Sequence, residues 1–175
     1  EDTLSLHDAL PISTAGLSLG EFTAHAAAGT FDFATGLNLV FQRGSFMEEA
    51  CDNTKGAMLA MIGGEESAIR ELAKECDVDV ANLNAPGQIV LSGSKSACDR
   101  AVEVASKMGL RATPLTVAGA FHSPLMQPAA DRLADALSRT EIKSPKCAVY
   151  ANVTGDVHDD EPDTIRRRLV EQLTS

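Results

Sequence analysis

TAGLSLGE, residues 14–21, places Ser18 between Gly16 and Gly20 and runs directly into a segment of good helix formers. A Gly-x-Ser-x-Gly run suits a sharp turn from a strand into a helix, because glycine lacks the Cβ atom that would crowd the three elements. The serine is then exposed at a helix N-terminus, where free N–H groups can stabilise an oxyanion. Ser18 is therefore a candidate nucleophile, with a turn or helix-capping serine as the alternative.

The composition is that of one ordinary globular domain, with 175 residues of which 44% are hydrophobic. No apolar run approaches the roughly 20 residues of a membrane helix, and no signal peptide opens the chain. We therefore expect a cytoplasmic protein without a membrane partner. A formal net charge of −10 argues against nucleic acid as a partner, since phosphate neutralisation needs a basic face. The four cysteines are widely spaced, which predicts free thiols and no metal site.

The middle of the chain is predicted to form a separate subdomain, because its segments follow the order β-α-β-β-α-β. This order is that of the ferredoxin-like, or split βαβ, unit. We expect this insert over residues 56–117. The predicted strands cover residues 56–62, 78–84, 88–92 and 110–117, and the predicted helices cover residues 65–76 and 94–108.

The flanking segments are predicted to be mainly helical, with helices over residues 21–28, 33–51, 124–140 and 163–173 and one strand over 148–153. Asp32 and Asp163 are the predicted caps of the second and last of these helices. The second helix is expected to bury an apolar stripe made of Phe33, Leu37, Val40, Phe41 and Met47.

The first 13 residues look out of place before a nucleophile turn. They lack the β-branched run of a buried strand, and Pro11 interrupts them. We therefore predict that residues 1–13 are a non-native leader, and that the strand which should present Ser18 is missing.

A nucleophilic serine needs a general base, and histidine is the usual one because its pKa lies near neutrality. His122 is the best candidate among the four histidines, since it lies between a loop of small residues and a predicted helix. A helix-capping or merely packed imidazole is the alternative. His7 lies in the suspect leader, His25 is expected to be a packed or half-exposed side chain, and His158 lies in an acidic loop.

Two further positions are candidates for substrate binding. Arg43 lies within a predicted helix beside Gly44, and its planar guanidinium suits a carboxylate, although a surface arginine that pairs with Glu48 or Glu49 is the alternative. Asn84 lies near the turn at Pro86, where its amide could bind a polar ligand or satisfy the turn's own backbone.

Several segments together resemble one family, the malonyl-CoA:acyl-carrier-protein transacylases of fatty acid synthesis, and more broadly the acyltransferase domains of polyketide synthases. The resemblance covers residues 14 to 175, and the order and spacing of its motifs agree throughout. The matching segments are GLSLGE at 16–21, QRGSFMEEA at 42–50, NLNAPGQ at 82–88, GAFHSPLM at 119–126 and ANV at 151–153.

The resemblance implies a role for each candidate. Ser18 resembles the acyl-accepting nucleophile and His122 its general base, whereas Arg43 resembles the arginine that pairs with the malonyl carboxylate. The N–H of Leu19 resembles one oxyanion donor, and Asn84 a residue that lines the cleft. The implied reaction is ping-pong: Ser18 takes malonyl from coenzyme A and passes it to the phosphopantetheine thiol of acyl carrier protein. No cofactor is implied, because the coenzyme A thioester is the substrate.

The chain also departs from the family pattern. Leu17 stands where the family often has histidine. Both ends look truncated, because neither the upstream Gly-Gln-Gly turn that supplies the second oxyanion donor nor the downstream residue whose carbonyl orients the histidine is recognisable. We therefore expect Ser18 to have half an oxyanion hole and His122 to lack its orienting residue.

The sequence thus predicts an α/β protein whose incomplete, hydrolase-like parallel-sheet core spans residues 14–55 and 118–175, with the active cleft between this core and the ferredoxin-like insert at 56–117. The predicted function is malonyl transfer by a monomer, with malonyl-CoA and acyl carrier protein as partners. The alternatives are a serine hydrolase or thioesterase that uses the same serine, and a truncated product without activity.

Overall fold

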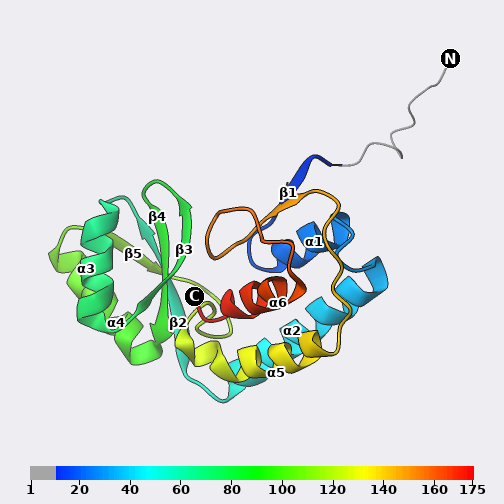
Figure 1. The fold of residues 1–175 in the computed structure, drawn as a ribbon. Helices are drawn as coiled ribbons and strands as arrows, with labels where there is room; N and C mark the ends of the chain where they lie inside the picture. The colour runs from blue at the N-terminus through cyan, green and yellow to red at the C-terminus, as the bar shows by residue number, and fades with distance from the viewer. Residues whose placement is uncertain (1–10) are drawn as a thin grey trace. The chain divides into compact units, whose positions relative to one another are not determined.

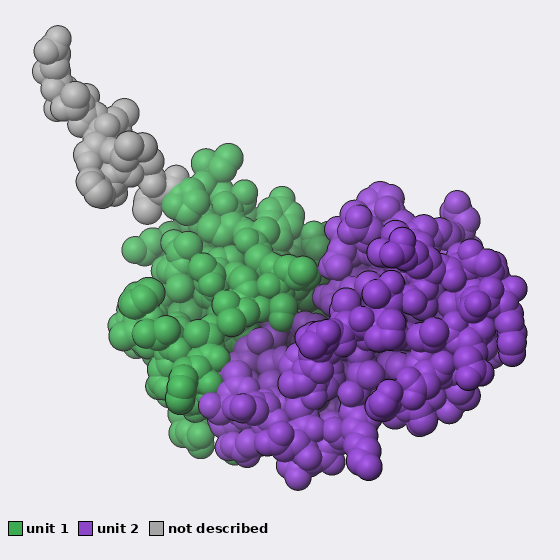
Figure 2. Space-filling model, turned by 180° about the vertical axis from the view of Figure 1, so that it is seen from behind, with its two compact units in different colours: residues 1–42, 134–169 green, residues 43–133, 170–175 purple. Residues whose placement is uncertain are grey.

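The computed structural model describes residues 11–175, so most of the predicted leader, residues 1–10, lies outside the described part of the chain. The chain divides into two compact units, shown in Figure 2. Unit 1 contains the residues up to Gln42 together with Ala134–Leu169, and unit 2 contains Arg43–Leu133 and Val170–Ser175.

Unit 1 is built around a small parallel sheet and the helix that follows its first strand. Strand β1 (Ser13–Ala15) pairs in parallel with β6 (Ala148–Tyr150), with Thr14 opposite Val149. Helix α1 (Leu19–Ala27) begins directly after Ser18, and its Ala24 packs against Val149. A strand therefore does lead into Ser18, and the prediction that this strand is missing is wrong. It consists of only three residues, too few to give a β-branched pattern in the sequence.

Helix α2 (Phe33–Asp52) begins where expected, and the N–H of Thr35 donates to Oδ1 of Asp32 at 2.8 Å, which confirms the predicted cap. Its predicted apolar stripe is largely wrong, because Phe33 is 78% exposed and Phe41 is 73% exposed. The buried face runs instead through Leu39, Arg43, Met47 and Ala50 at helical spacing. Large apolar residues biased the prediction toward the wrong face, although Arg43 lies on the buried one.

Unit 2 contains a four-stranded antiparallel sheet with the strand order β3-β4-β2-β5. This order, with two helices between the strands, confirms the predicted ferredoxin-like arrangement. All six elements fall within residues 56–117, although the domain boundaries themselves stay a prediction. The elements are β2 (Gly56–Ile62), α3 (Glu66–Cys76), β3 (Asp79–Ala85), β4 (Gln88–Ser94), α4 (Lys95–Lys107) and β5 (Arg111–Pro114).

Alternation along β2 separates the two faces of this sheet. Leu59 and Met61 face helices α3 and α4, which lie together on one side of the sheet in Figure 1, and join their buried core. Met58 joins a smaller cluster with Val90 and Phe121. The second face is therefore partly covered by the loop that contains His122.

The remaining helices end or begin differently from the prediction. A 3₁₀ turn (Pro124–Met126) precedes α5 (Gln127–Ser138), so the predicted helix over residues 124–140 is two elements. Helix α6 (Pro162–Glu171) begins one residue before Asp163, which therefore lies in its first turn and is not its cap. Within residues 11–175, none of the helices is both long and apolar enough to cross a bilayer.

Candidate active site

Ser18 occupies a strained turn between β1 and α1 in unit 1. Its backbone has φ 53° and ψ −112°, a conformation that non-glycine residues rarely adopt and that costs of the order of 1–3 kcal/mol. The side chain makes no capping hydrogen bond, which argues against the alternative of a helix-capping serine. This geometry is that of a nucleophile turn, in which the backbone is bent so that the serine projects from its apex.

The two glycines of this turn have different roles. A Cβ atom on Gly16 would lie 2.1 Å from the carbonyl carbon of Gly20, so only glycine fits at position 16. A Cβ atom on Gly20 would have no heavy atom within 4 Å, so the expectation that both glycines relieve crowding holds only for Gly16. Position 20 matters for its backbone, which passes close to Gly16.

The first turn of α1 contains Leu19, the predicted oxyanion donor. Leu19 is the first residue of this helix, so its N–H has no acceptor within the helix. The N–H of Ser18 donates to Oδ1 of Asn152 at 2.8 Å and is therefore engaged. The assignment of Leu19 as an oxyanion donor stays a prediction that this geometry suits.

His122 and Arg43 both contact Gln172 in unit 2. Nδ1 of His122 lies 2.6 Å from the main-chain oxygen of Gln172, and Nη2 of Arg43 donates to the side-chain Oε1 of the same residue at 2.9 Å. All three side chains are buried. The expectation that His122 lacks an orienting residue is therefore wrong. Sequence reasoning missed Gln172 because a main-chain carbonyl has no signature in the residue type.

This arrangement fixes the chemical state of His122. Because a carbonyl oxygen can only accept, Nδ1 carries the proton, and Nε2 is the unprotonated ring nitrogen. Burial lowers the pKa of His122 below 6.5, the carbonyl of Gln172 opposes this shift, and the positive charge of Arg43 adds to it. The imidazole is thus neutral near pH 7, which is the form that a general base requires.

Arg43 is a buried cation, which excludes the alternative of a surface arginine paired with Glu48 or Glu49. Only 5% of the residue is exposed. A buried guanidinium needs hydrogen-bonding or anionic partners, and Gln172 supplies a neutral one. A guanidinium in this position suits an anionic ligand group such as a carboxylate, because its planar fork can hold both carboxylate oxygens.

Of the predicted residues, the structure thus brings Arg43 and His122 together around Gln172, whereas Ser18 and Leu19 belong to unit 1. Asn84 lies exposed near the end of β3. Its predicted role in lining a cleft, and the cleft itself, stay predictions.

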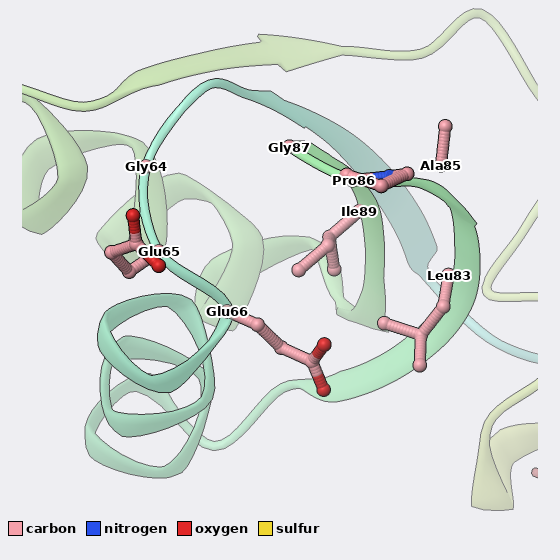
Figure 3. Close-up of a pocket in the computed structure, with 8 residues that line it drawn as sticks. All are labelled: Gly64, Glu65, Glu66, Leu83, Ala85, Pro86, Gly87 and Ile89. Atoms are coloured by element: carbon pink, nitrogen blue, oxygen red, sulfur yellow. The ribbon is translucent and has the colours of Figure 1, made fainter.

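A pocket of about 620 Å³ opens in unit 2 beside the turn that follows Asn84. In Figure 3 its lining comes from the start of α3, with Glu65 and Glu66, and from β3 and β4, with Leu83 and Ile89. None of Ser18, Arg43 and His122 lines this pocket. Its two carboxylates would repel an anionic substrate, so it does not suit the chemistry of Arg43.

A buried polar cluster in unit 1 was not predicted from the sequence. Nε2 of His158 lies 2.7 Å from Oε1 of Glu21 and 3.3 Å from Nε2 of His25. All three residues are buried, which confirms His25 as a packed side chain. The spacing of Glu21 and His25, four residues apart on one helix face, was the only local signal of this cluster.

This cluster offers the one group of potential metal ligands within residues 11–175, with its donor atoms within 4.8 Å of one another. Its hydrogen bonding fits a metal poorly. A metal on Nε2 of His158 would require a proton on Nδ1, which has no hydrogen-bond partner among the described residues. A proton on Nε2 donated to Glu21 leaves only an acceptor unsatisfied, which is the less costly arrangement.

Comparisons with known proteins agree with this geometry. The family model described as "Acyl transferase domain" matches residues 9–172. The malonyl CoA-acyl carrier protein transacylase of Bacillus subtilis is 42% identical over 171 residues, which cover 94% of this chain and 54% of that protein. The Escherichia coli (strain K12) transacylase is 41% identical over 169 residues, covering 93% and 54%.

Solved structures give the same result. The malonyl CoA-acyl carrier protein transacylase of Coxiella burnetii matches with a TM-score of 0.89 at 41% identity, covering 94% of this chain and 53% of that one. An acyl carrier protein S-malonyltransferase of Vibrio cholerae matches with a TM-score of 0.92 at 38% identity, covering 97% and 57%. The chain thus spans about half the length of the curated relatives it matches.

Proposed function

The chain belongs to the acyl transferase domain family, and from that premise we propose that it carries the acyl-accepting serine and the general base of a malonyl transferase. The reaction moves a malonyl group from malonyl-CoA to the phosphopantetheine thiol of acyl carrier protein, in fatty acid synthesis. Relatives whose names state this activity support the choice of substrates. A solved complex of a related malonyl-transacylase with an acyl-carrier protein supports the choice of partner.

One observation carries the proposal: Gln172 contacts the base and the cation at once, through its carbonyl to His122 and through its side chain to Arg43. A hydrolase of plain esters has no carboxylate to bind, so it gains nothing from a buried guanidinium beside its base. A malonyl thioester carries that carboxylate, and a fixed guanidinium would both select and orient it.

In the proposed reaction, Nε2 of His122 accepts the proton of the Ser18 hydroxyl while the serine oxygen attacks the thioester carbonyl. The N–H of Leu19 stabilises the resulting oxyanion. When the intermediate collapses, the carbon–sulfur bond breaks and His122 returns the proton to the coenzyme A thiolate. The carrier protein's thiol then attacks the seryl ester by the same steps in reverse.

The same proposal includes a cytoplasmic location, a monomer and no cofactor. All four cysteines are free thiols, which fits a reducing compartment. Serine catalysis on an activated thioester needs no further group.

Intact-mass spectrometry after incubation with malonyl-CoA tests the proposal. We expect the chain to gain the mass of one malonyl group, Ser18→Ala to gain none, and the adduct to move to holo-carrier protein when this is added. Loss of the adduct to water faster than to the carrier thiol would favour the hydrolase alternative. If wild type forms no adduct, this chain is not an acyl transferase on its own.

A further inference from the structure

The nucleophile's backbone is tied to a distant loop by a side chain with no role in the proposed reaction. The N–H of Ser18 donates to Oδ1 of Asn152 at 2.8 Å, across 134 positions of sequence. Asn152 follows β6, whose pairing with β1 brings this loop beside the nucleophile turn within unit 1. The contact therefore ties the backbone of the strained residue to this loop.

A second hydrogen bond connects Asn152 to the first turn of α1. The main-chain N–H of Asn152 donates to Oε1 of Glu21 at 3.1 Å, and the N–H of Glu21 donates to the carbonyl of Ser18 at 3.1 Å. Ser18, Asn152 and Glu21 thus form a closed ring of three hydrogen bonds. A ring of this kind fixes the serine backbone from both sides, because its N–H and its carbonyl are both engaged.

His158 and His25 connect this ring of hydrogen bonds to the buried core of unit 1. Nε2 of His158 lies 2.7 Å from Oε1 of Glu21, the oxygen that also accepts from Asn152. The main-chain N–H of His158 donates to the carbonyl of Val149 in β6 at 2.7 Å. Nδ1 of His25 lies 3.0 Å from the hydroxyl of Thr30. The Glu21 side chain is fully buried, so its carboxylate cannot move to another position without losing these partners.

We propose that Asn152 and Glu21 are positioning residues that hold Ser18 in its reactive, positive-φ conformation, an inference that rests on the proposed function of Ser18. In the proposed reaction neither side chain forms or breaks a bond. Their effect is on the direction of the serine hydroxyl and of the Leu19 N–H, which both follow from the backbone angles of residue 18. Loss of either positioning side chain should therefore lower kcat and leave KM nearly unchanged.

The test combines amide exchange with acylation kinetics. In Asn152→Ala we expect the Ser18 amide to exchange with solvent at least about 10-fold faster by NMR, and kcat for malonyl loading to fall about 10²-fold, the size expected for a small misplacement of a reacting group. Asn152→Asp keeps an acceptor oxygen and should recover most of both losses. Asn38→Ala, an exposed asparagine of the same unit, is the matched control and should change neither.

A second pair of variants tests the ring itself. Glu21→Ala should also speed exchange of the Ser18 amide, Glu21→Gln should preserve its protection, and the double variant with Asn152→Ala should be no worse than Asn152→Ala alone. A variant that unfolds would lose the dispersion of its amide signals throughout the NMR spectrum. In that case Asn152→Asp and Glu21→Gln test the ring. For them, protection of the Ser18 amide supports the ring and loss of protection overturns it.

Three outcomes separate the possible errors. Unchanged exchange and unchanged kcat in folded Asn152→Ala would overturn the positioning role. One equivalent of a divalent metal that copurifies with wild type and is lost in His25→Leu would overturn it in favour of a metal site. If wild type is not acylated at all, the proposed function fails for this chain, whereas amide exchange still tests whether the ring holds Ser18.

Discussion

The main-chain oxygen of Gln172 lies 2.6 Å from Nδ1 of His122. Because this carbonyl accepts a hydrogen bond from the protonated Nδ1, the unprotonated nitrogen of the imidazole is Nε2. The orientation of the proposed base is thus fixed by the backbone just after α6, at a position 50 residues further along the chain.

The first prediction concerns the pH dependence of Ser18 acylation. Burial and Arg43 lower the pKa of His122 below 6.5, so the neutral base persists as the pH falls through 6.5. We expect the rate of acylation to be constant from pH 8 to below 6.5 and to decrease only at lower pH, with His122→Ala about 10²- to 10⁴-fold slower throughout. Stopped-flow acetyl-CoA loading measures the profile. In Arg43→Ala the decrease in rate at low pH should begin at a higher pH, because the charge that lowers the pKa of His122 is removed. An unchanged profile would contradict this effect of Arg43 on the pKa of His122.

The second prediction concerns the choice between acyl groups. Removal of a charge-assisted hydrogen bond costs about 1.5–3 kcal/mol, so Arg43→Ala should lower kcat/KM for malonyl-CoA by about 10- to 100-fold. Loading of acetyl-CoA should change little, because acetyl has no carboxylate. Arg70→Ala removes an exposed arginine of the same unit and serves as control. An equal loss for both acyl groups would show that Arg43 does not bind the carboxylate.

The third prediction uses the two glycines of the nucleophile turn. Gly16→Ala places a methyl group 2.1 Å from backbone atoms of Gly20 that cannot move easily, so we expect a loss of about 3 kcal/mol or more in the free energy of unfolding. Gly20→Ala meets no atom within 4 Å and replaces glycine inside a helix, so it should stabilise by up to about 1 kcal/mol. Urea denaturation measures both. Similar effects of the two substitutions would be inconsistent with this geometry.

The fourth prediction concerns stability in acid. Burial, with a contribution from His158, lowers the pKa of His25 to about 3, whereas an unfolded chain binds this proton near pH 6.5. The unfolded state therefore holds more protons between these two values, so the contribution of His25 is complete above pH 6.5 and is lost as the pH falls. The slope is about 1.4 kcal/mol per pH unit. The stability curve of His25→Leu, from urea titrations at pH 4.5 to 8, should be correspondingly flatter. Parallel curves for variant and wild type would rule out this effect.

Much of unit 2 could be predicted because its strands and turns are specified by residues that are close together in the sequence. Strand β2 has the predicted bounds, Gly56–Ile62, since a short apolar run between turn residues leaves few alternatives. The turn at Pro86-Gly87 lies between β3 and β4 as expected, with Gly87 at φ 74°. The order of these elements then limits the possible sheets, and the predicted ferredoxin-like arrangement is the observed one.

The site was predicted less completely, for a physical reason. Ser18, Arg43 and His122 have side chains whose chemistry suggests a role, and short motifs surround them. Gln172 acts through its main chain, and Asn152 through a contact across 134 positions, so neither leaves a pattern in its own neighbourhood.

The buried face of α2 likewise could not be predicted from nearby residues. A periodic apolar pattern shows that a helix has two faces, but the face that is buried depends on what packs against it. Phe33 and Phe41 suggested one face, whereas the structure buries the face with Leu39 and Met47. The buried guanidinium of Arg43 made the correct face look less apolar than the exposed one.

Mutations at position 172 affect the two contacts of Gln172 differently. Every amino acid has a main-chain carbonyl, so a mutation at codon 172 leaves the partner of His122 in place wherever the backbone path is kept. Only the contact with Arg43 depends on the side chain that the codon specifies. If Arg43 and His122 have the proposed roles, substitutions at this single position can alter how the cation is held while the orientation of the imidazole is kept, which would let acyl preference change without loss of the base.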